Sequence, residues 1–453
     1  MMRRTIKALT VVGTLGVLGA CDSYFSGPGI DTNPNVPSQA AADQLFVGFQ
    51  GFSTANMTGD NNRVISLFTQ QMAGTGRQWA GYDQYSITEN DFQWDSYYNG
   101  GGLVDLRKVQ DQVKGDKLYL GIAQVWEALI VGQLADMWGD IPYSDALGAS
   151  STPTLDKQAD VYAKLQTLLD NAITNLNAGG NGPGAADLVF GGAKAPWLQV
   201  ARTLKARLYM HTAESDATAY AKALTETGSG ISSAANDFTT YQSGTTGEQN
   251  QWFQFRIQRG TDISAGALLV NLMKSRNDPR LTDYFGAGPA AGGVIIGAEP
   301  GEEDDGTFAW LSDGRGSPDF RQPIVTFAEN QLIRAEAQYK TGATAAALQT
   351  LNAFRATVGL PALNVSGSAL YTAIMEEKYV SLFQNVEVWN DYKRTCYPNL
   401  TPVTGTTIPA RFLYGASERN SNPNIPSPSQ QPRRNTNDPR TTTSTDGSAC
   451  KGQ

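Results

Sequence analysis

The sequence has few of the residues on which most enzymes and metal sites depend. It contains one histidine, His211, and three cysteines, Cys21, Cys396 and Cys450, in 453 residues. A Ser-His-Asp site would need His211, and no histidines or cysteines have the spacing of a zinc site. The patterns G-x-x-x-x-G-K and G-x-S-x-G are both missing. We therefore predict that the protein is not an enzyme and uses no metal or other cofactor.

Excess positive charge and long apolar runs are also missing. Without the three basic residues of its leader, the chain has 32 basic and 43 acidic side chains, a net charge of −11. A chain this acidic is a poor candidate for binding nucleic acid, which requires a basic face. Beyond the leader, no stretch approaches 18 consecutive apolar residues, so we predict no transmembrane helix.

The first residues form a leader rather than part of the folded body. Arg3, Arg4 and Lys7 precede a 13-residue apolar run that is too short to span a bilayer of about 30 Å. The run ends in Leu-Gly-Ala-Cys at 18–21, which resembles the lipobox of bacterial lipoproteins. The alternative is an ordinary cleaved leader with a cysteine nearby. We predict a signal peptide at 1–20, lipidation of Cys21 and an anchored tether at 21–37, because two or more acyl chains make a stable anchor.

The rest of the chain is predicted to be mainly α. A helix carrying Leu118, Ile122, Val125 and Leu129 precedes residue 134, and other apolar repeats at helical spacing lie at 159–176, 197–213, 218–226, 263–275, 323–340, 345–358, 370–384 and 387–394. Gly342 separates two amphipathic helices that resemble a tetratricopeptide unit of about 34 residues. A short strand pairing around 293–296 is the only β-structure expected. We predict one helical domain at 38–419, with long irregular loops, and a poorly ordered low-complexity segment at 420–453.

The segment LADMWGDIPYSDAL, at 134–147, raises the question of a catalytic site. Gly139 and Pro142 stop the preceding helix, and Asp140 can accept backbone hydrogen bonds at the turn. Acid–base catalysis by Asp136, Asp140 or Asp145 would need two carboxylates with separated pKa values facing one cleft. We interpret the segment as a structural corner. A disulfide between Cys396 and Cys450 and free thiols at both positions remain equally open.

Six segments share their order along the chain with those of one family: IDTNPNVPS, LADMWGDIPYSDAL, NDPRLTDYF, ENQLIRAEA followed by LNAFR, IMEEKYVSLFQNVEVWNDYKRT, and IPARFLYGASERNSNPN. The second resembles that family's helix-end segment, Ala-x-x-(aromatic/Leu)-Gly-Asp-Ile-Pro-Tyr. The fifth resembles its Glu-rich helix, which leads to Trp-x-Asp-hydrophobic-x-Arg. On these segments the chain resembles the SusD/RagB family of nutrient-binding lipoproteins, and in particular its SusD-like subgroup.

This resemblance implies a tetratricopeptide-like scaffold that is lipid-anchored at the cell outer membrane and faces the exterior. Its partner would be a SusC-like TonB-dependent outer-membrane transporter, to which it passes a captured nutrient, most often an oligosaccharide. Peptide ligands and bound Ca²⁺ stay open. One rival is a structural lid of the transporter, which predicts that the aromatic segments are buried. The other is a helical glycoside hydrolase, which predicts two carboxylates about 5–9.5 Å apart across a cleft.

Aromatic segments supply the candidate ligand-binding residues. Sugars stack their apolar faces on tryptophan and tyrosine, while charged or amide side chains bond their hydroxyl groups. The stretch 78–98 is rich in aromatics without a helical period and is predicted to be a loop. The resemblance points to this region and to a loop before the late helical pair, so the candidates are Arg77, Trp79, Tyr82, Tyr85, Trp94, Phe308 and Trp310. QWFQFR at 251–256 is a third and weaker candidate. The acidic run at 302–306 is predicted to be a solvated loop rather than a Ca²⁺ site.

Overall fold

The computed structural model describes residues 40–89, 92–148, 150–403, 407–432 and 435. The predicted signal peptide, the lipidated Cys21 and the tether all lie outside these residues. Cys396 is disulfide-bonded. The other two cysteines lie outside the described residues, so a Cys396–Cys450 pairing stays a prediction.

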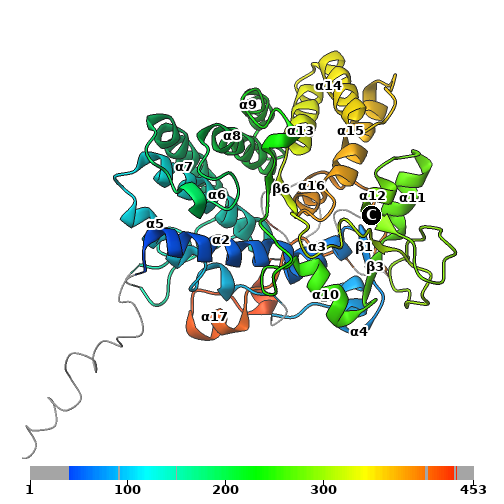
Figure 1. The fold of residues 1–453 in the computed structure, drawn as a ribbon, viewed down its shortest axis with the longest axis horizontal. Helices are drawn as coiled ribbons and strands as arrows, with labels where there is room; N and C mark the ends of the chain where they lie inside the picture. The colour runs from blue at the N-terminus through cyan, green and yellow to red at the C-terminus, as the bar shows by residue number, and fades with distance from the viewer. Residues whose placement is uncertain (1–39, 90–91, 149, 404–406, 433–434, 436–453) are drawn as a thin grey trace, which may run out of the picture.

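Helices form most of the fold, as predicted (Figure 1). In chain order they are α2 (Ala42–Thr58), α3 (Asp60–Phe68), α4 (Arg77–Asp83), α5 (Leu103–Gln112), α6 (Lys117–Trp138), α7 (Gln158–Ala178), α8 (Lys194–His211), α9 (Ala219–Thr227), α10 (Gln251–Arg259), α11 (Ala267–Ser275), α12 (Leu281–Tyr284), α13 (Phe327–Lys340), α14 (Thr344–Thr357), α15 (Gly367–Ser381), α16 (Glu387–Thr395) and α17 (Ala416–Ser421). Single 3-10 turns lie at Asp95–Tyr97, Gly184–Ala186, Ala234–Asn236 and Pro428–Gln430.

Apart from two isolated bridges, β-structure in the described part of the chain is limited to three antiparallel pairs. β1 (Met72–Gly74) pairs with β3 (Ile263–Ala265), β2 (Phe238–Thr239) with β6 (Pro323–Val325), and β4 (Phe285–Gly286) with β5 (Trp310–Leu311). The predicted pairing around 293–296 is wrong, because Gly292 and Gly293 have positive φ angles of 62° and 88° and turn the chain there.

The helix α6 lies at the centre of the main core and packs on α7 and α8. Asp116 caps its first turn by accepting a hydrogen bond from the Tyr119 amide, 3.1 Å away. The helix is long and apolar enough to cross a membrane, but 89% of its most apolar window is buried inside the protein. It is therefore the core helix of a globular body.

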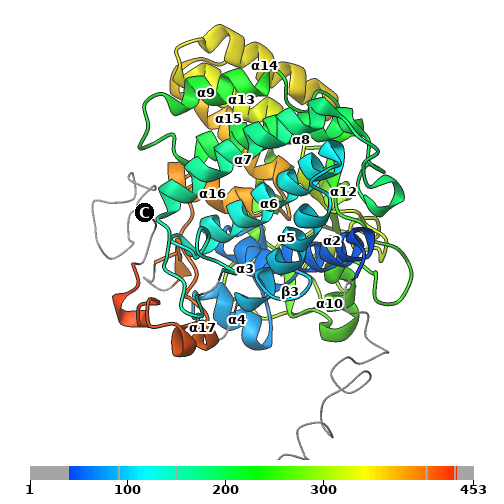
Figure 2. The same cartoon turned by 90° about the vertical axis from the view of Figure 1, so that its left-hand side faces the viewer.

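The tetratricopeptide-like pair is confirmed at α13 and α14. Thr326 caps α13 by accepting from the Glu329 amide, and Gly342 turns the chain with φ 87°. Leu332, Leu351 and Ile374 share a separate small core in which α15 also packs. Figures 1 and 2 both place these helices at one end of the molecule and α4 with α10 at the other.

Several short helices and strands differ from the predicted secondary structure. The stretch 78–98 is not one loop, since most of α4 and a 3-10 turn lie within it. α4 has only seven residues, and its two buried side chains, Trp79 and Asp83, give no visible period. The helices predicted from 263 and 323 begin only at Ala267 and Phe327, because the preceding residues form β3 and β6.

The first part of the predicted low-complexity segment is folded. Asn422, Ile425 and Gln431 are buried. The amide of Asn422 donates to the Pro153 carbonyl, 2.9 Å away, and so holds this segment against the loop after α6. The packed chain thus extends beyond residue 419. Polar composition concealed this because the segment is held by side-chain amides and by a single apolar side chain, Ile425, that joins the main core.

Candidate functional site

The segment 134–147 is a structural corner, as predicted. Gly139 ends α6 with φ 79° and ψ −114°, a conformation that favours glycine. Asp140 accepts hydrogen bonds from the Gln158 amide (2.9 Å) and from Lys157 Nζ (2.7 Å). Asp156 accepts from the amides of Tyr143 and Ser144 in the same turn. All these carboxylate contacts connect the end of α6 to the start of α7.

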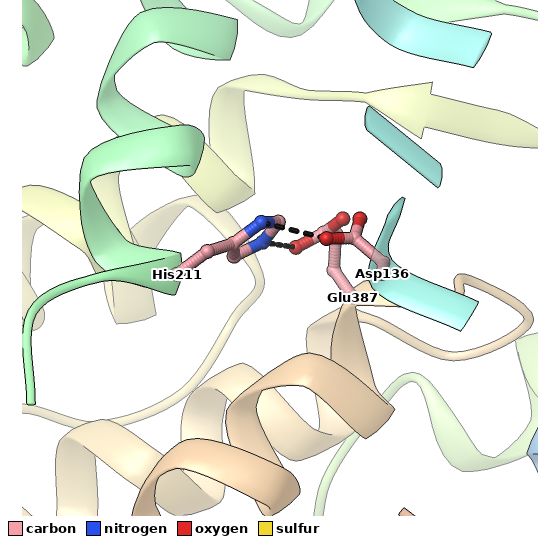
Figure 3. A group of neighbouring side chains, drawn as sticks. All are labelled: Asp136, His211 and Glu387. Atoms are coloured by element: carbon pink, nitrogen blue, oxygen red, sulfur yellow. Dashed lines mark hydrogen bonds and ion pairs between the residues drawn. The ribbon is translucent and has the colours of Figure 1, made fainter. Parts of the chain in front are cut away.

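Asp136, in the same segment, belongs to a buried group with His211 and Glu387 (Figure 3). His211 comes from the last residue of α8, and its ring points between the two carboxylates. Nδ1 lies 2.9 Å from Asp136 Oδ1, and Nε2 lies 2.8 Å from Glu387 Oε2. Tyr162 donates to Asp136 Oδ1 at 2.6 Å, and Arg207 Nη1 lies 3.6 Å from Glu387. The prediction that His211 is a core or helix-surface residue is confirmed, with the core as its location.

The group is an ion-pair network rather than a reactive centre. Burial would lower the pKa of His211, but the nearby carboxylates of Asp136 and Glu387 overcome this and raise it to about 10. Burial would raise the pKa of Glu387, but Arg207 and His211 lower it to about 2. Because both ring nitrogens already face carboxylates at hydrogen-bonding distance, neither has a lone pair directed at a metal position. No substrate can reach these fully buried atoms.

The seven candidate ligand-binding residues separate into two groups. Tyr85 and Trp94 pack into the core and are 9% and 2% exposed. Trp94 contacts the rings of Trp138 and Tyr414, and Tyr85 contacts Phe68. Tyr85 borders a cavity of about 320 Å³ and Trp94 one of about 370 Å³. A ligand-binding role for these two residues stays a prediction.

Helix α10, which contains the weaker candidate segment QWFQFR, brings together Trp79, Tyr82 and Trp310. Phe255 of α10 lies 5.0 Å from Trp79 and 6.3 Å from Trp310 between ring centroids, and Tyr82 lies 5.4 Å from Trp79. With Trp252, 6.0 Å from Trp310, these five rings form what we call the α4–α10 aromatic cluster. Segments that are distant in sequence thus meet at one place.

Arg63 of α3 is a buried cation that packs against three rings of this cluster. The guanidinium of Arg63 lies 4.8 Å from the centre of Phe255, 5.7 Å from Trp79 and 5.8 Å from Trp252. It pairs with Asp60 and donates to the Gln251 carbonyl at 3.1 Å. Burial lowers the pKa of Arg63, while Asp60 opposes that effect. Arg63 could not be predicted as part of this cluster, since an arginine within an apolar repeat of α3 indicates only a helix face.

Polar and exposed side chains surround the cluster. The Arg77 side chain is 63% exposed, has a positive φ of 49°, and lies 3.4 Å from Asp262. Arg256 lies over Trp310, with its guanidinium carbon 5.1 Å from the ring centroid, and the neighbouring Ile257 is 63% exposed. Phe308 is half-buried, two residues before Trp310. Tyr82, Phe308 and Arg77 are therefore the more accessible side chains here, whereas Trp79, Phe255 and Trp310 are only 3%, 6% and 8% exposed.

Asp83 connects the cluster to the acidic run. Its carboxylate, at the end of α4, accepts from the Gly301 amide at 2.6 Å. Burial raises the pKa of Asp83 to about 7, against the hydrogen bonds from backbone amides. The acidic run itself is mostly exposed, and among the residues that the structure describes it brings no three ligand atoms together at metal-binding distance.

Three cavities in the described part of the chain lie near the corner at 134–147 and away from the α4–α10 aromatic cluster. Their volumes are about 530, 320 and 370 Å³. Arg411 borders the first two, and its guanidinium is already bonded to the carbonyls of Trp138 and Pro432. None of these three is lined by a ring of the α4–α10 aromatic cluster.

The fold is a mainly helical scaffold with the aromatic cluster at one end. A sequence profile of the SusD-like family, described as starch-binding proteins associating with the outer membrane, matches residues 34–415. The chain belongs to this family. It is therefore an outer-membrane-associated, nutrient-binding protein of a class whose members are generally non-catalytic.

Solved structures share the fold at low sequence identity. A SusD/RagB family protein from Bacteroides thetaiotaomicron has a TM-score of 0.70 and 21% identity over 85% of this chain and 95% of its own. A chitin-binding SusD homologue from Flavobacterium johnsoniae has a TM-score of 0.73 and 19% identity, with 87% and 98% covered. A SusD homologue from Bacteroides fragilis has a TM-score of 0.70 and 18% identity, with 85% and 94% covered. No curated protein matches the chain in sequence.

Proposed function

We propose that the chain is a surface lipoprotein, anchored through Cys21, that captures an extracellular oligosaccharide and delivers it to a SusC-like TonB-dependent transporter. The observation that carries this proposal is the meeting of Trp79, Tyr82 and Trp310 with Phe255 in one aromatic cluster. Capture needs no bond-making, so affinity arises from stacking and from hydrogen bonds to hydroxyl groups. Arg77 is the exposed polar group best able to make such bonds.

The class of sugar is proposed from the relatives and from the chemistry of the cluster. The family is described as starch-binding, and one structural relative as chitin-binding. Both polymers are uncharged chains of pyranose rings, whose C–H faces stack on aromatic side chains. A neutral glucan or an N-acetylglucosamine polymer is therefore the first choice of ligand.

A second candidate function is the structural lid of the transporter, with no ligand of its own. The burial of Trp79, Trp94, Tyr85 and Trp310, all at most 9% exposed, favours it. A lid would retain its transporter contacts after any substitution in the cluster. Hydrolysis has less support, because the buried Asp136 and Glu387 are both paired with His211 and face no cleft.

Depletion assays on insoluble chitin and granular starch test the proposal. The chain from Asp22 to Gln453 is mixed with each polymer, and the protein left in solution is measured. Arg77→Ala and Tyr82→Ala should reduce the bound fraction. Tyr209→Ala should not, because Tyr209 packs against a separate small core that contains no ring of the aromatic cluster. Equal loss in all three variants, or no binding by any, would favour the lid function.

A further inference from the structure

Trp310 is the ring of the α4–α10 aromatic cluster whose surroundings are least complete. It is 92% buried, yet its indole N–H has no acceptor among the residues that the structure describes. A buried donor without an acceptor loses its hydrogen bond to water and gains none in return. An oxygen atom supplied by a ligand would restore that bond.

The group lying over this ring is Arg256. Its guanidinium is 5.1 Å from the Trp310 centroid, and its Nη1 donates to the Gly260 carbonyl at 3.1 Å. In the described part of the chain, Arg256 has no ion pair within 4.0 Å. Asp304 is the carboxylate that acts on it through space. Arg256 is therefore held by one hydrogen bond to its own helix end and by its contact with the indole.

A comparison with Arg63 shows why Arg256 is the movable arginine. Arg63 is buried, pairs with Asp60 and contacts three rings from below. Arg256 is only half-buried, and it lies on an exposed turn of α10 beside Ile257, which is 63% exposed. A partly exposed cation–π contact is weak enough for a stacking ligand to replace.

We propose that Arg256 is a displaceable cover on Trp310. It lies on the indole when the site is empty and turns toward Asp304 when a sugar ring stacks on the indole face. A hydroxyl group that extends past the edge of the indole then accepts from its N–H, which points along the ring plane. This inference rests on the proposed oligosaccharide function, and it makes Arg256 a residue that sets affinity without contacting the sugar.

The cover can be tested in the protein without any sugar. The chain from Asp22 to Gln453 is labelled with 5-fluorotryptophan, and the Trp310 resonance is assigned with Trp310→Phe. Arg256→Ala should shift this resonance and increase its change between H₂O and D₂O, because the indole becomes exposed. The matched control is Arg259→Ala, one turn further along α10, which should leave it unchanged. An unchanged Trp310 resonance in Arg256→Ala would overturn the proposal.

Affinities for maltohexaose and chitohexaose supply the second test. Arg256→Ala should bind about two- to fivefold more tightly, the equivalent of about 0.5–1 kcal/mol. Arg259→Ala should bind as the wild type does, and Asp304→Asn should bind about twofold more weakly. Weaker or equal binding by Arg256→Ala would overturn the cover, since it would mean that Arg256 contacts the sugar or does nothing. If neither sugar binds the wild type, the proposed function fails for these sugars. The Trp310 resonance in Arg256→Ala then remains the test of whether Arg256 covers the indole.

Discussion

His211 shows how single residues acquire a role that their sequence context does not reveal. Its position in a helix predicted either the surface or the core. The structure adds two carboxylates, Asp136 from α6 and Glu387 from α16, at 2.9 and 2.8 Å from its ring nitrogens. These residues are 75 or more positions away in sequence, so no local pattern could pair them. Their attraction holds a proton on a buried ring.

This network makes stability depend on pH in a defined direction. The folded pKa of His211, about 10, lies above its unfolded value near 6.5, so its contribution is complete below pH 6.5 and is lost as pH rises toward 10. The folded pKa of Glu387, about 2, lies below its usual 4.5, so its contribution is complete above pH 4.5 and is lost toward pH 2. From these two groups we expect maximal stability between about pH 4.5 and 6.5.

The measurement is urea unfolding of the wild type and of His211→Gln at pH 6 and pH 9. At pH 6 the variant should lose roughly 3–5 kcal/mol of unfolding free energy, because two buried carboxylates lose their cation. The loss should be smaller at pH 9. Equal losses at both pH values would show that His211 is not charged in the folded protein.

Substitution of Asp83 should have the opposite effect on stability to substitution of His211. Its folded pKa, raised by burial to about 7, lies above the model-peptide value of 3.8, so ionising it costs folding free energy as pH rises from about 4 to above 7. Asp83→Asn keeps an oxygen to accept from the Gly301 amide. The variant should therefore gain stability relative to the wild type at pH 8 but not at pH 4.5. Thermal unfolding at both pH values measures this, and a variant less stable at pH 8 would refute it.

At the scale of elements, long amphipathic helices were predictable and short ones were not. α7, α8 and α14 start and end within a few residues of the predicted ranges, because apolar side chains repeat over three or more turns. α4 and β3 were missed, because seven and three residues are too few for a period to appear. β3 reads as the start of a helix in sequence, and only its pairing with β1 makes it a strand.

The end of α6 supplies a prediction at this scale. Gly139→Ala should cost about 1–3 kcal/mol, because its φ of 79° and ψ of −114° are unfavourable for alanine, and the new methyl group would lie 2.4 Å from Asn435 Oδ1. Gly51→Ala, inside α2 with nothing within 4 Å of the new carbon, is the matched control and should gain roughly 0.5–1 kcal/mol. Chemical denaturation of both variants gives the values. Two changes of the same sign would contradict this explanation of the corner.

At the scale of the whole molecule, family and fold could be predicted but the assembled site could not. The order of six segments along the chain indicated the SusD-like family, which the profile match over residues 34–415 confirms. The sequence allowed Trp79, Trp310 and the segment that contains Phe255 to be named as candidates, but not the contacts through which Phe255 and Arg63 join them. Such a site depends on tertiary packing of α3, α4, α10 and β5, and local sequence patterns do not show which rings will face each other.

The most direct test of the account is calorimetric titration of Asp22–Gln453 with malto- and chito-oligosaccharides and with a panel of plant and microbial polysaccharides. We predict saturable binding to one glycan class. Tyr82→Ala and Trp310→Ala should weaken it roughly two- to tenfold, the range expected for a lost aromatic stacking contact, while Tyr209→Ala should bind normally. Absence of binding across the panel, or binding that survives both substitutions unchanged, would contradict the claim that the α4–α10 aromatic cluster captures the nutrient.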